Sequence, residues 1–301
     1  MHSMISSRRT FVALALAGAA CLPLAKAAAG PFVSERITVR TEGTGPDVIL
    51  IPGLNSSPRV WASAVAAVPG YRYHFVQVRG FAGLPAGKAD KSGNVAAPVA
   101  EEIARYISAS GLKRPAVIGH SMGGTIGLML AARHPDCLAR LMVVDMIPYL
   151  GAMFAAPGAT PAQIGAISDR IFEGMRAASA TQIAKSANDT MSGMVNNAAM
   201  RPVAIKDSLD SDPEVSARAF RELIVTNLIP ELNKIMVPVT VLYVQPKSAG
   251  GPPEQFDAVY KNVYAPVRNV TLKRIPDSGH FIMWDQPERF QSEVAEFLNP
   301  R

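Results

Sequence analysis

The stretch Gly-His-Ser-Met-Gly-Gly, residues 119–124, places a serine hydroxyl between glycines, and its context decides the fold. The pattern Gly-x-Ser-x-Gly alone is weak, because it arises by accident in roughly one chain in ten of this length. The preceding run Pro-Ala-Val-Ile, residues 115–118, is typical of a buried strand, and the run from Gly123 to His134 predicts a helix. A strand, a tight turn and a helix would hold Ser121 on a sharp bend, with glycines where the two backbones approach.

Short apolar runs and helical patterns alternate along most of the chain. Seven runs are candidate strands: residues 35–41, 47–53, 71–80, 115–121, 139–146, 237–244 and 269–280. Helical patterns lie between them, near residues 58–68, 95–109, 121–134, 254–264 and 287–298. Apolar strands without polar alternation suit a sheet that is buried on both faces. The sequence therefore predicts an α/β fold with a mostly parallel, doubly wound sheet and helices on both faces.

One segment breaks this alternation. Residues 148–232 contain no strand candidate, and apolar residues such as Ile164, Ile167 and Ile171 recur there at helical spacing. We predict a helical cap of about residues 148–232, inserted between two strands and lying over the carboxyl edge of the sheet.

The first 27 residues have the pattern of a removable signal peptide. A twin arginine, Arg8-Arg9, precedes an apolar stretch over residues 11–25, which is too short to span a bilayer comfortably. The stretch ends in Ala-Lys-Ala, residues 25–27, an A-x-A-like cleavage site. The segment resembles a bacterial twin-arginine export signal, with an ordinary secretory signal as the alternative. We expect a domain of residues 28–301, periplasmic or extracellular, with no stable membrane span.

Composition limits the partners of this domain. Cleavage after Ala27 would remove three basic residues and no acid, which leaves 27 basic and 24 acidic residues and a net charge of +3. No long block of like charge occurs, so we expect no nucleic-acid partner. Only Cys137 would remain, and the Cys/His spacing of a zinc site is absent. We predict no metal and no organic cofactor.

A serine hydroxyl needs a base to become a nucleophile, and histidine is the usual one. Of the four histidines beyond the signal, His74 lies in a strand pattern, His134 ends a helix, and His120 is poorly placed to face the neighbouring serine. His280 differs, because it follows Asp-Ser-Gly just after the last strand candidate. Enzymes built on parallel sheets keep catalytic groups in such loops. We predict Ser121 as the nucleophile and His280 as its base.

The developing oxyanion needs backbone N–H donors. One should come from Met122, directly after the nucleophile, and the other from the loop after Val-Ile-Leu-Ile-Pro-Gly, at Leu54 and Asn55. The same loop is also consistent with a simple strand-to-helix turn in which Ser56 or Ser57 is the N-cap. Both can hold, because an oxyanion hole uses only backbone amides.

Residues 32–300 resemble the α/β-hydrolase fold in its capped, single-domain form. The matching pieces, in the right order, are LIPGLNSS, GHSMGG, RLMVVDMIP, VPVTVLY and SGHFIMWDQPERF. In the counting of that fold, the strand at 139–146 is the sixth, so the cap follows the sixth strand. Serine at position 121 disfavours the dehalogenases and epoxide hydrolases of the fold, which use an aspartate there.

This resemblance implies a serine hydrolase that cleaves carboxylic esters through an acyl-enzyme intermediate. Its substrate would be a small apolar ester or a related acyl compound. Amide, lactone or carbon–carbon bond hydrolysis by the same groups is an alternative. A non-catalytic ligand-binding member of the fold is another, since fold does not fix function.

The third catalytic residue is the point where the sequence departs from the pattern. The resemblance implies an acid just after the seventh strand, but Gln-Pro-Lys stands there, at residues 245–247. Glu254 and Asp257 lie farther on, where acids favour a helix start, and Asp277 is close to the predicted base. Asp145 ends the sixth strand, and some members of the fold carry their acid there. It preserves the chain order Ser, Asp, His. We predict Asp145, with Glu254 and Asp257 as the alternatives.

Overall fold

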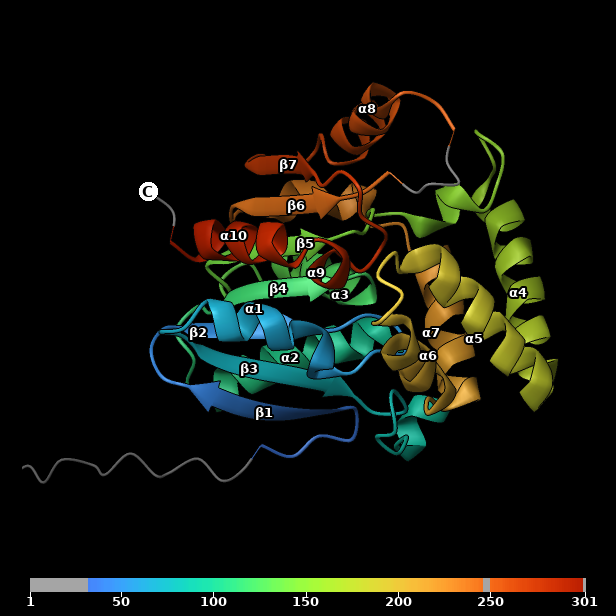
Figure 1. Ribbon diagram of the computed structural model, residues 1–301, viewed down its shortest axis with the longest axis horizontal. Coiled ribbons are helices and arrows are strands. Elements are labelled where there is room, and N and C mark those ends of the chain that lie inside the picture. Colours follow the sequence, from blue (N-terminus) through green and yellow to red (C-terminus); the bar gives the residue numbers. More distant parts are fainter. Residues whose placement is uncertain (1–31, 246–249, 300–301) are drawn as a thin grey trace, which may run out of the picture. The chain divides into compact units, whose positions relative to one another are not determined.

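Seven strands form one sheet in the part of the chain that the computed structural model describes, residues 32–245 and 250–299 (Figure 1). The strands are β1 (Ile37–Gly43), β2 (Asp47–Ile51), β3 (Arg72–Val78), β4 (Ala116–His120), β5 (Arg140–Val144), β6 (Val239–Tyr243) and β7 (Val270–Arg274). Their order across the sheet is β1-β3-β2-β4-β5-β6-β7. The pair of β1 and β3 is antiparallel, and all other neighbours are parallel. The predicted mostly parallel sheet is confirmed.

Alternating side chains divide the sheet between two cores. Val48 and Leu50 of β2 join the core under one face, whereas Ile49 and Ile51 join the core under the other. Helices α1 (Ala62–Ala67), α9 (Ile282–Asp285) and α10 (Pro287–Leu298) cover the first face; α2 (Ala96–Ala109), α3 (Met122–Arg133) and α8 (Pro253–Val263) cover the second. Both faces are covered, which is why the central strands are apolar throughout.

Helix α3 directly follows β4 and is the most enclosed helix of this layer. Every residue from Met122 to Ala132 is buried, so the helix is apolar all round rather than amphipathic. Its first turn starts immediately after Ser121, at the carboxyl edge of the sheet.

A helical insert separates β5 from β6. It contains η3 (Leu150–Met153), α4 (Pro161–Ala177), α5 (Ala180–Met194), α6 (Arg201–Leu209), α7 (Pro213–Val225) and η4 (Ile229–Lys234). We call residues 150–234 the helical insert. Figure 1 shows α4 to α7 beyond the carboxyl ends of the parallel strands, on the right of the view. Val215, Leu223 and Ile224 form the buried stripe of α7, in keeping with its apolar spacing.

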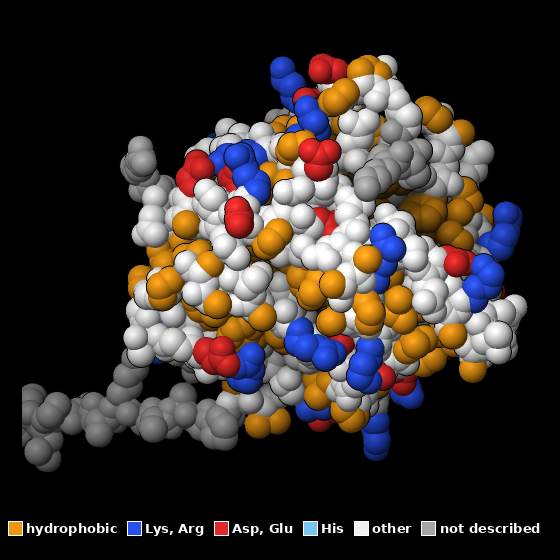
Figure 2. All heavy atoms as spheres, viewed as in Figure 1, with side chains coloured by type: hydrophobic (Ala, Val, Ile, Leu, Met, Phe, Trp, Pro, Cys, Tyr) orange, Lys and Arg blue, Asp and Glu red, His pale blue; other side chains and the backbone are white. Residues whose placement is uncertain are grey.

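Two further short helices complete the described chain, η1 (Pro58–Trp61) and η2 (Lys88–Lys91). Acidic and basic side chains lie interspersed over the face seen in Figure 2. Ion pairs such as Arg72 with Asp47 occur in the described chain. Within the described ranges, no helix is both long and apolar enough to cross a bilayer. The predicted signal peptide and its boundary at residue 27 lie outside these ranges.

Candidate active site

Ser121 occupies a strained turn between β4 and α3. Its φ is 53° and its ψ −121°, a backbone conformation that residues other than glycine rarely adopt. The Ser121 N–H donates to the Val144 carbonyl at 2.9 Å, and its own carbonyl accepts from the Gly124 N–H at 2.7 Å. These bonds fix the turn from both sides, and the half-buried side chain stands at the carboxyl edge of the sheet.

The glycines of the motif are required by close backbone contacts. A Cβ on Gly119 would lie 2.1 Å from the Gly123 carbonyl oxygen, and a Cβ on Gly123 would lie 2.1 Å from the Ile51 carbonyl oxygen. Real Cβ atoms do not approach backbone so closely. The expectation that strand and helix approach each other too closely for larger residues is therefore confirmed.

His280 and Asp145 lie in direct contact. The His280 Nδ1 is 2.6 Å from the Asp145 Oδ2, although 135 residues separate them in the chain. Asp145 follows β5 directly and has a positive φ of 51°. The two side chains are 20% and 10% exposed, so the pair is largely shielded from water but remains open to a ligand. This contact fixes the Nδ1 proton on His280 and leaves its Nε2 as the free base.

One of the competing acids, Asp257, is engaged elsewhere. Asp257 accepts hydrogen bonds from the Tyr243 hydroxyl at 2.8 Å and from the Arg274 guanidinium at 2.9 Å. Glu254 lies in the first turn of α8, as its sequence position suggested. Among the described acids, Asp145 is the one that bonds to the His280 ring.

Two donors that the sequence analysis missed hold Asp145 in place. Its Oδ1 accepts the Val244 N–H at 3.1 Å and lies 3.4 Å from the Tyr260 hydroxyl. Burial raises the pKa of Tyr260 well above its ordinary value, so this hydroxyl stays protonated and acts as a donor. Tyr260 comes from α8 and stacks on Tyr243, with ring centroids 3.9 Å apart. The sequence of α8 shows a tyrosine within an amphipathic helix, but it does not show which acid the tyrosine hydroxyl contacts.

His120 supports the backbone of the base rather than the serine. Its Nε2 lies 3.0 Å from the His280 carbonyl oxygen, so Nε2 carries the proton and donates. The ring is fully buried. This burial is the main cause that holds the pKa of His120 well below its ordinary value, and the nearby His280 is the second cause. His120 is therefore neutral, and its Nε2 is engaged with the His280 carbonyl. That His120 does not act as the base of Ser121 stays a prediction.

The other two histidines have structural contacts. His74 is buried and lies 2.8 Å from the Asp47 carboxylate and 2.6 Å from the Tyr106 hydroxyl. His134 lies 2.9 Å from the Glu101 carboxylate at the surface. His74 belongs to β3 and His134 follows the last residue of α3. Among the described histidines, His280 is the one paired with an acid at the carboxyl edge.

The two predicted oxyanion donors lie on elements that meet at the serine. Met122 is the first residue of α3, so its N–H has no carbonyl one turn earlier in the helix to bond. Leu54 follows Gly53, and a Cβ on Gly53 would lie 3.1 Å from the Ser121 Cβ. The loop that carries Leu54 and Asn55 therefore runs directly beside the nucleophile. Asn55 has a positive φ of 56°, which turns the chain sharply at this point.

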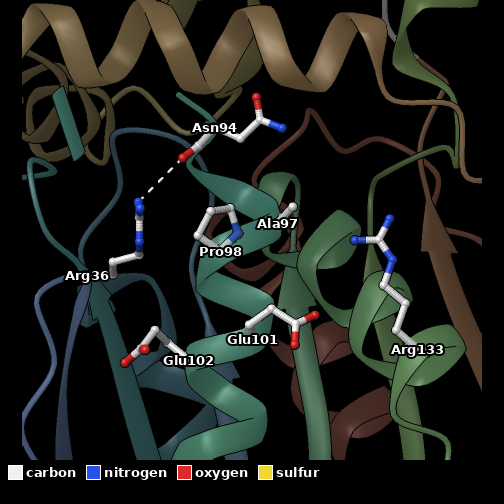
Figure 3. Close-up of a pocket in the computed structure, with 7 residues that line it drawn as sticks. All are labelled: Arg36, Asn94, Ala97, Pro98, Glu101, Glu102 and Arg133. Carbon is white, nitrogen blue, oxygen red and sulfur yellow. Dashed lines mark hydrogen bonds between the residues drawn. The ribbon is translucent and has the colours of Figure 1, made fainter. Parts of the chain in front are cut away.

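A separate hollow lies at the N-terminal end of α2 and contains none of the predicted catalytic residues. Figure 3 shows its lining, in which the Arg36 side chain reaches the Asn94 carbonyl at 3.4 Å. Its charged groups are engaged in pairs, for example Arg133 with Glu231 at 2.9 Å. We assign no chemistry to this hollow.

Comparison with known proteins finds related sequences and folds. A family model described as "Alpha/beta hydrolase family" matches residues 48–292. The chain is 27% identical over 135 residues to the pimeloyl-acyl-carrier-protein methyl ester esterase of Vibrio vulnificus, covering 44% of this chain and 50% of that protein. It is 27% identical over 205 residues to the sn-1-specific diacylglycerol lipase of Mus musculus, covering 62% and 60%. The chain thus spans about half the length of these curated relatives.

A solved structure extends the similarity to nearly the whole fold. The enol-lactonase from Burkholderia xenovorans superposes with a TM-score of 0.71 at 19% sequence identity, over 87% of this chain and 96% of that one. At this identity the likeness concerns the fold alone.

Proposed function

Because the chain belongs to the alpha/beta hydrolase family, we propose that it is an exported serine hydrolase that cleaves carboxylic esters. The observation that carries this proposal is the strained Ser121 at the carboxyl edge of the sheet, together with the His280–Asp145 pair at the same edge. Strain at a turn is retained where the surrounding structure enforces it, and such turns occur often at active sites.

In the proposed reaction, the Ser121 hydroxyl attacks the acyl carbon of the ester while the His280 Nε2 takes its proton. Asp145 accepts the Nδ1–H bond, holds the tautomer and stabilises the imidazolium. The N–H groups of Leu54 and Met122 donate to the oxyanion. The ester C–O bond then breaks, and the leaving alcohol takes the proton from His280. A water molecule, deprotonated by His280, attacks the acyl-serine, and the acid leaves with Ser121 restored.

The paired acid favours this reading over a non-catalytic ligand binder. A binder would have no need of a carboxylate 2.6 Å from a histidine at the sheet edge that also carries a strained serine. We further propose that the helical insert acts as a cap and that small apolar esters or related acyl compounds bind beneath it. Its position beyond the carboxyl ends of the strands supports this role.

A panel of p-nitrophenyl esters of increasing acyl length tests the proposal, with Ser121→Ala as the control. We expect turnover of at least the short esters by the wild-type protein. The rate of ester hydrolysis with the Ser121→Ala variant should fall to the uncatalysed rate in buffer alone. Equal rates for the folded wild type and the variant on every ester would exclude the proposed activity and favour the binder.

A further inference from the structure

We propose that α6 and the connection before it are a strut that positions both catalytic loops, with Asp285 and Asp207 as the positioning residues at its two ends. The inference rests on the proposed function, because it concerns the loop of the predicted base and the loop of the predicted oxyanion donor. It assigns the helical insert a part in catalysis beyond covering a pocket.

The first end of the strut binds the loop of His280. The Asp285 Oδ2 accepts the Gly279 N–H at 2.8 Å and the Asn196 N–H at 3.1 Å, and its Oδ1 accepts the Asn197 N–H at 2.8 Å. One carboxylate thus joins the residue before His280 to the α5–α6 connection. Hydrogen bonds to an ionised acceptor are about twice as strong as neutral ones.

Backbone packing reinforces this end. A Cβ on Gly279 would lie 2.4 Å from the Met194 carbonyl oxygen, so the base loop lies directly against the end of α5. The Asn197 side-chain amide donates to the Trp284 carbonyl at 3.1 Å. On the other side, the Arg201 Nε of α6 donates to the Val195 carbonyl at 2.8 Å. The connection is therefore held by the base loop and by α6 together.

The second end of the strut binds the loop of Leu54. Asp207, near the end of α6, is 1% exposed, and its Oδ2 accepts the Ser57 N–H at 3.0 Å and the Ser57 hydroxyl at 2.6 Å. Arg59 pairs with its other oxygen. A buried charge with this set of partners fixes the loop strongly, because loss of any partner leaves an unsatisfied buried group.

A neighbouring helix adds a weaker tie to the same loop. The Ser216 hydroxyl of α7 lies 2.7 Å from the Asn55 side-chain oxygen, next to Leu54. The predicted base and the predicted oxyanion donor are thus both attached to the insert. A displacement of α6 would move both relative to Ser121, which is fixed by β4 and α3.

The test compares Asp285→Asn and Asp207→Asn with Asp210→Asn, a matched control at the exposed residue just after α6, whose carboxylate pairs with Lys206. The substrate is p-nitrophenyl acetate, whose acyl group is too small to depend on pocket shape. We expect kcat per folded molecule to fall about tenfold to a hundredfold in both test variants, with KM little changed. The melting temperature should fall as well, because an amide NH2 would face donors that the carboxylate accepted. The control should retain wild-type kcat.

The split between kcat and KM separates a positioning role from a purely structural one. Both variants should lower kcat per folded molecule on the acetate ester and leave KM unchanged, because the reacting groups are displaced while the ester site is not. A purely structural role would lower the melting temperature and the folded fraction, and would leave kcat per folded molecule unchanged.

Unchanged kcat on the acetate ester in both folded variants would overturn the proposal, even if KM for longer esters rose. If the aspartate variants do not fold, Ser216→Ala and Asn197→Ala each remove the hydrogen bonds of one neutral side chain and keep both carboxylates. Full kcat in both of these variants would overturn the proposal as well. Inactive wild-type protein would instead reject the proposed function, so the two failures are distinguishable.

Discussion

At the scale of single residues, the site depends on contacts that cross long stretches of chain. Asp145 meets His280 at 2.6 Å and is itself held by the Val244 N–H and the Tyr260 hydroxyl. The acid therefore stands after β5, and the backbone after β6 supplies a donor to it. This arrangement accounts for the Gln-Pro-Lys sequence where the fold usually has its acid.

Replacing Asp145 by Asn tests its assignment. The amide keeps the size of the side chain but loses the charge that stabilises the imidazolium and fixes the tautomer. We expect kcat to fall about a hundredfold to ten-thousandfold while the melting temperature changes little. Steady-state kinetics on a short p-nitrophenyl ester measures the effect.

Glu254→Gln and Asp257→Asn are the controls for this variant. Asp257 contacts Tyr243 and Arg274 at the surface, so its loss should affect turnover little. A crippled Glu254→Gln or Asp257→Asn, beside a nearly fully active Asp145→Asn, would place the acid after β6 instead.

Residues whose role depends on local sequence context could be predicted. Ser121 and His280 lie at the ends of strand candidates, where a turn or loop follows the strand. The contact between Asp207 and Ser57 could not be predicted, because it spans 150 residues; no pattern marks Asp207, and Ser57 is identified only as a possible N-cap. Asp285 was likewise unmarked, since its three partners are backbone N–H groups that any residue can supply.

Among the secondary-structure elements, the strands and the helices that cover the sheet could be predicted from the sequence. All seven apolar runs contain a strand, and the helical patterns coincide with η1–α1, α2, α3, α8 and α10. In the insert, apolar spacing shows which side of α7 is buried but not what it packs against. The position of α6 between the loop of Leu54 and the connection that holds the loop of His280 depends on tertiary contacts, and no local sequence pattern predicts it.

The approach of α3 to β2 gives an element-scale prediction. In Gly123→Ala the new Cβ would meet the Ile51 carbonyl oxygen, which is backbone and cannot turn aside. We expect a loss of about 1–3 kcal/mol in the free energy of unfolding from overpacking, together with a displaced Ser121 and reduced turnover. Thermal unfolding and ester hydrolysis measure the two effects.

The matched control is Gly165→Ala in α4, where a Cβ meets no atom within 4 Å. It makes the same substitution within a helix and should stabilise the protein by up to about 1 kcal/mol, because alanine favours helix more than glycine does. If Gly123→Ala were as stable and as active as this control, the close approach of α3 to the Ile51 carbonyl would not constrain the turn at Ser121.

At the scale of the whole molecule, the proposed export depends on residues outside the described chain. Arg8-Arg9 and the Ala-Lys-Ala site at 25–27 support a twin-arginine signal. Replacing both arginines by lysine should leave uncleaved precursor in the cytoplasm, because that route reads the arginine pair. Cell fractionation and the size of the product measure this outcome. Unchanged export of the lysine variant would indicate the general secretory route.

We propose that the whole fold presents Ser121 as a nucleophile activated by His280. Reaction with a fluorophosphonate probe, followed by intact mass and peptide mapping, tests this proposal, because the probe forms a stable adduct only with an activated serine. We expect one adduct per molecule, located on Ser121, and none in folded His280→Ala. An unlabelled wild type, an adduct on another serine, or full labelling of His280→Ala would contradict it.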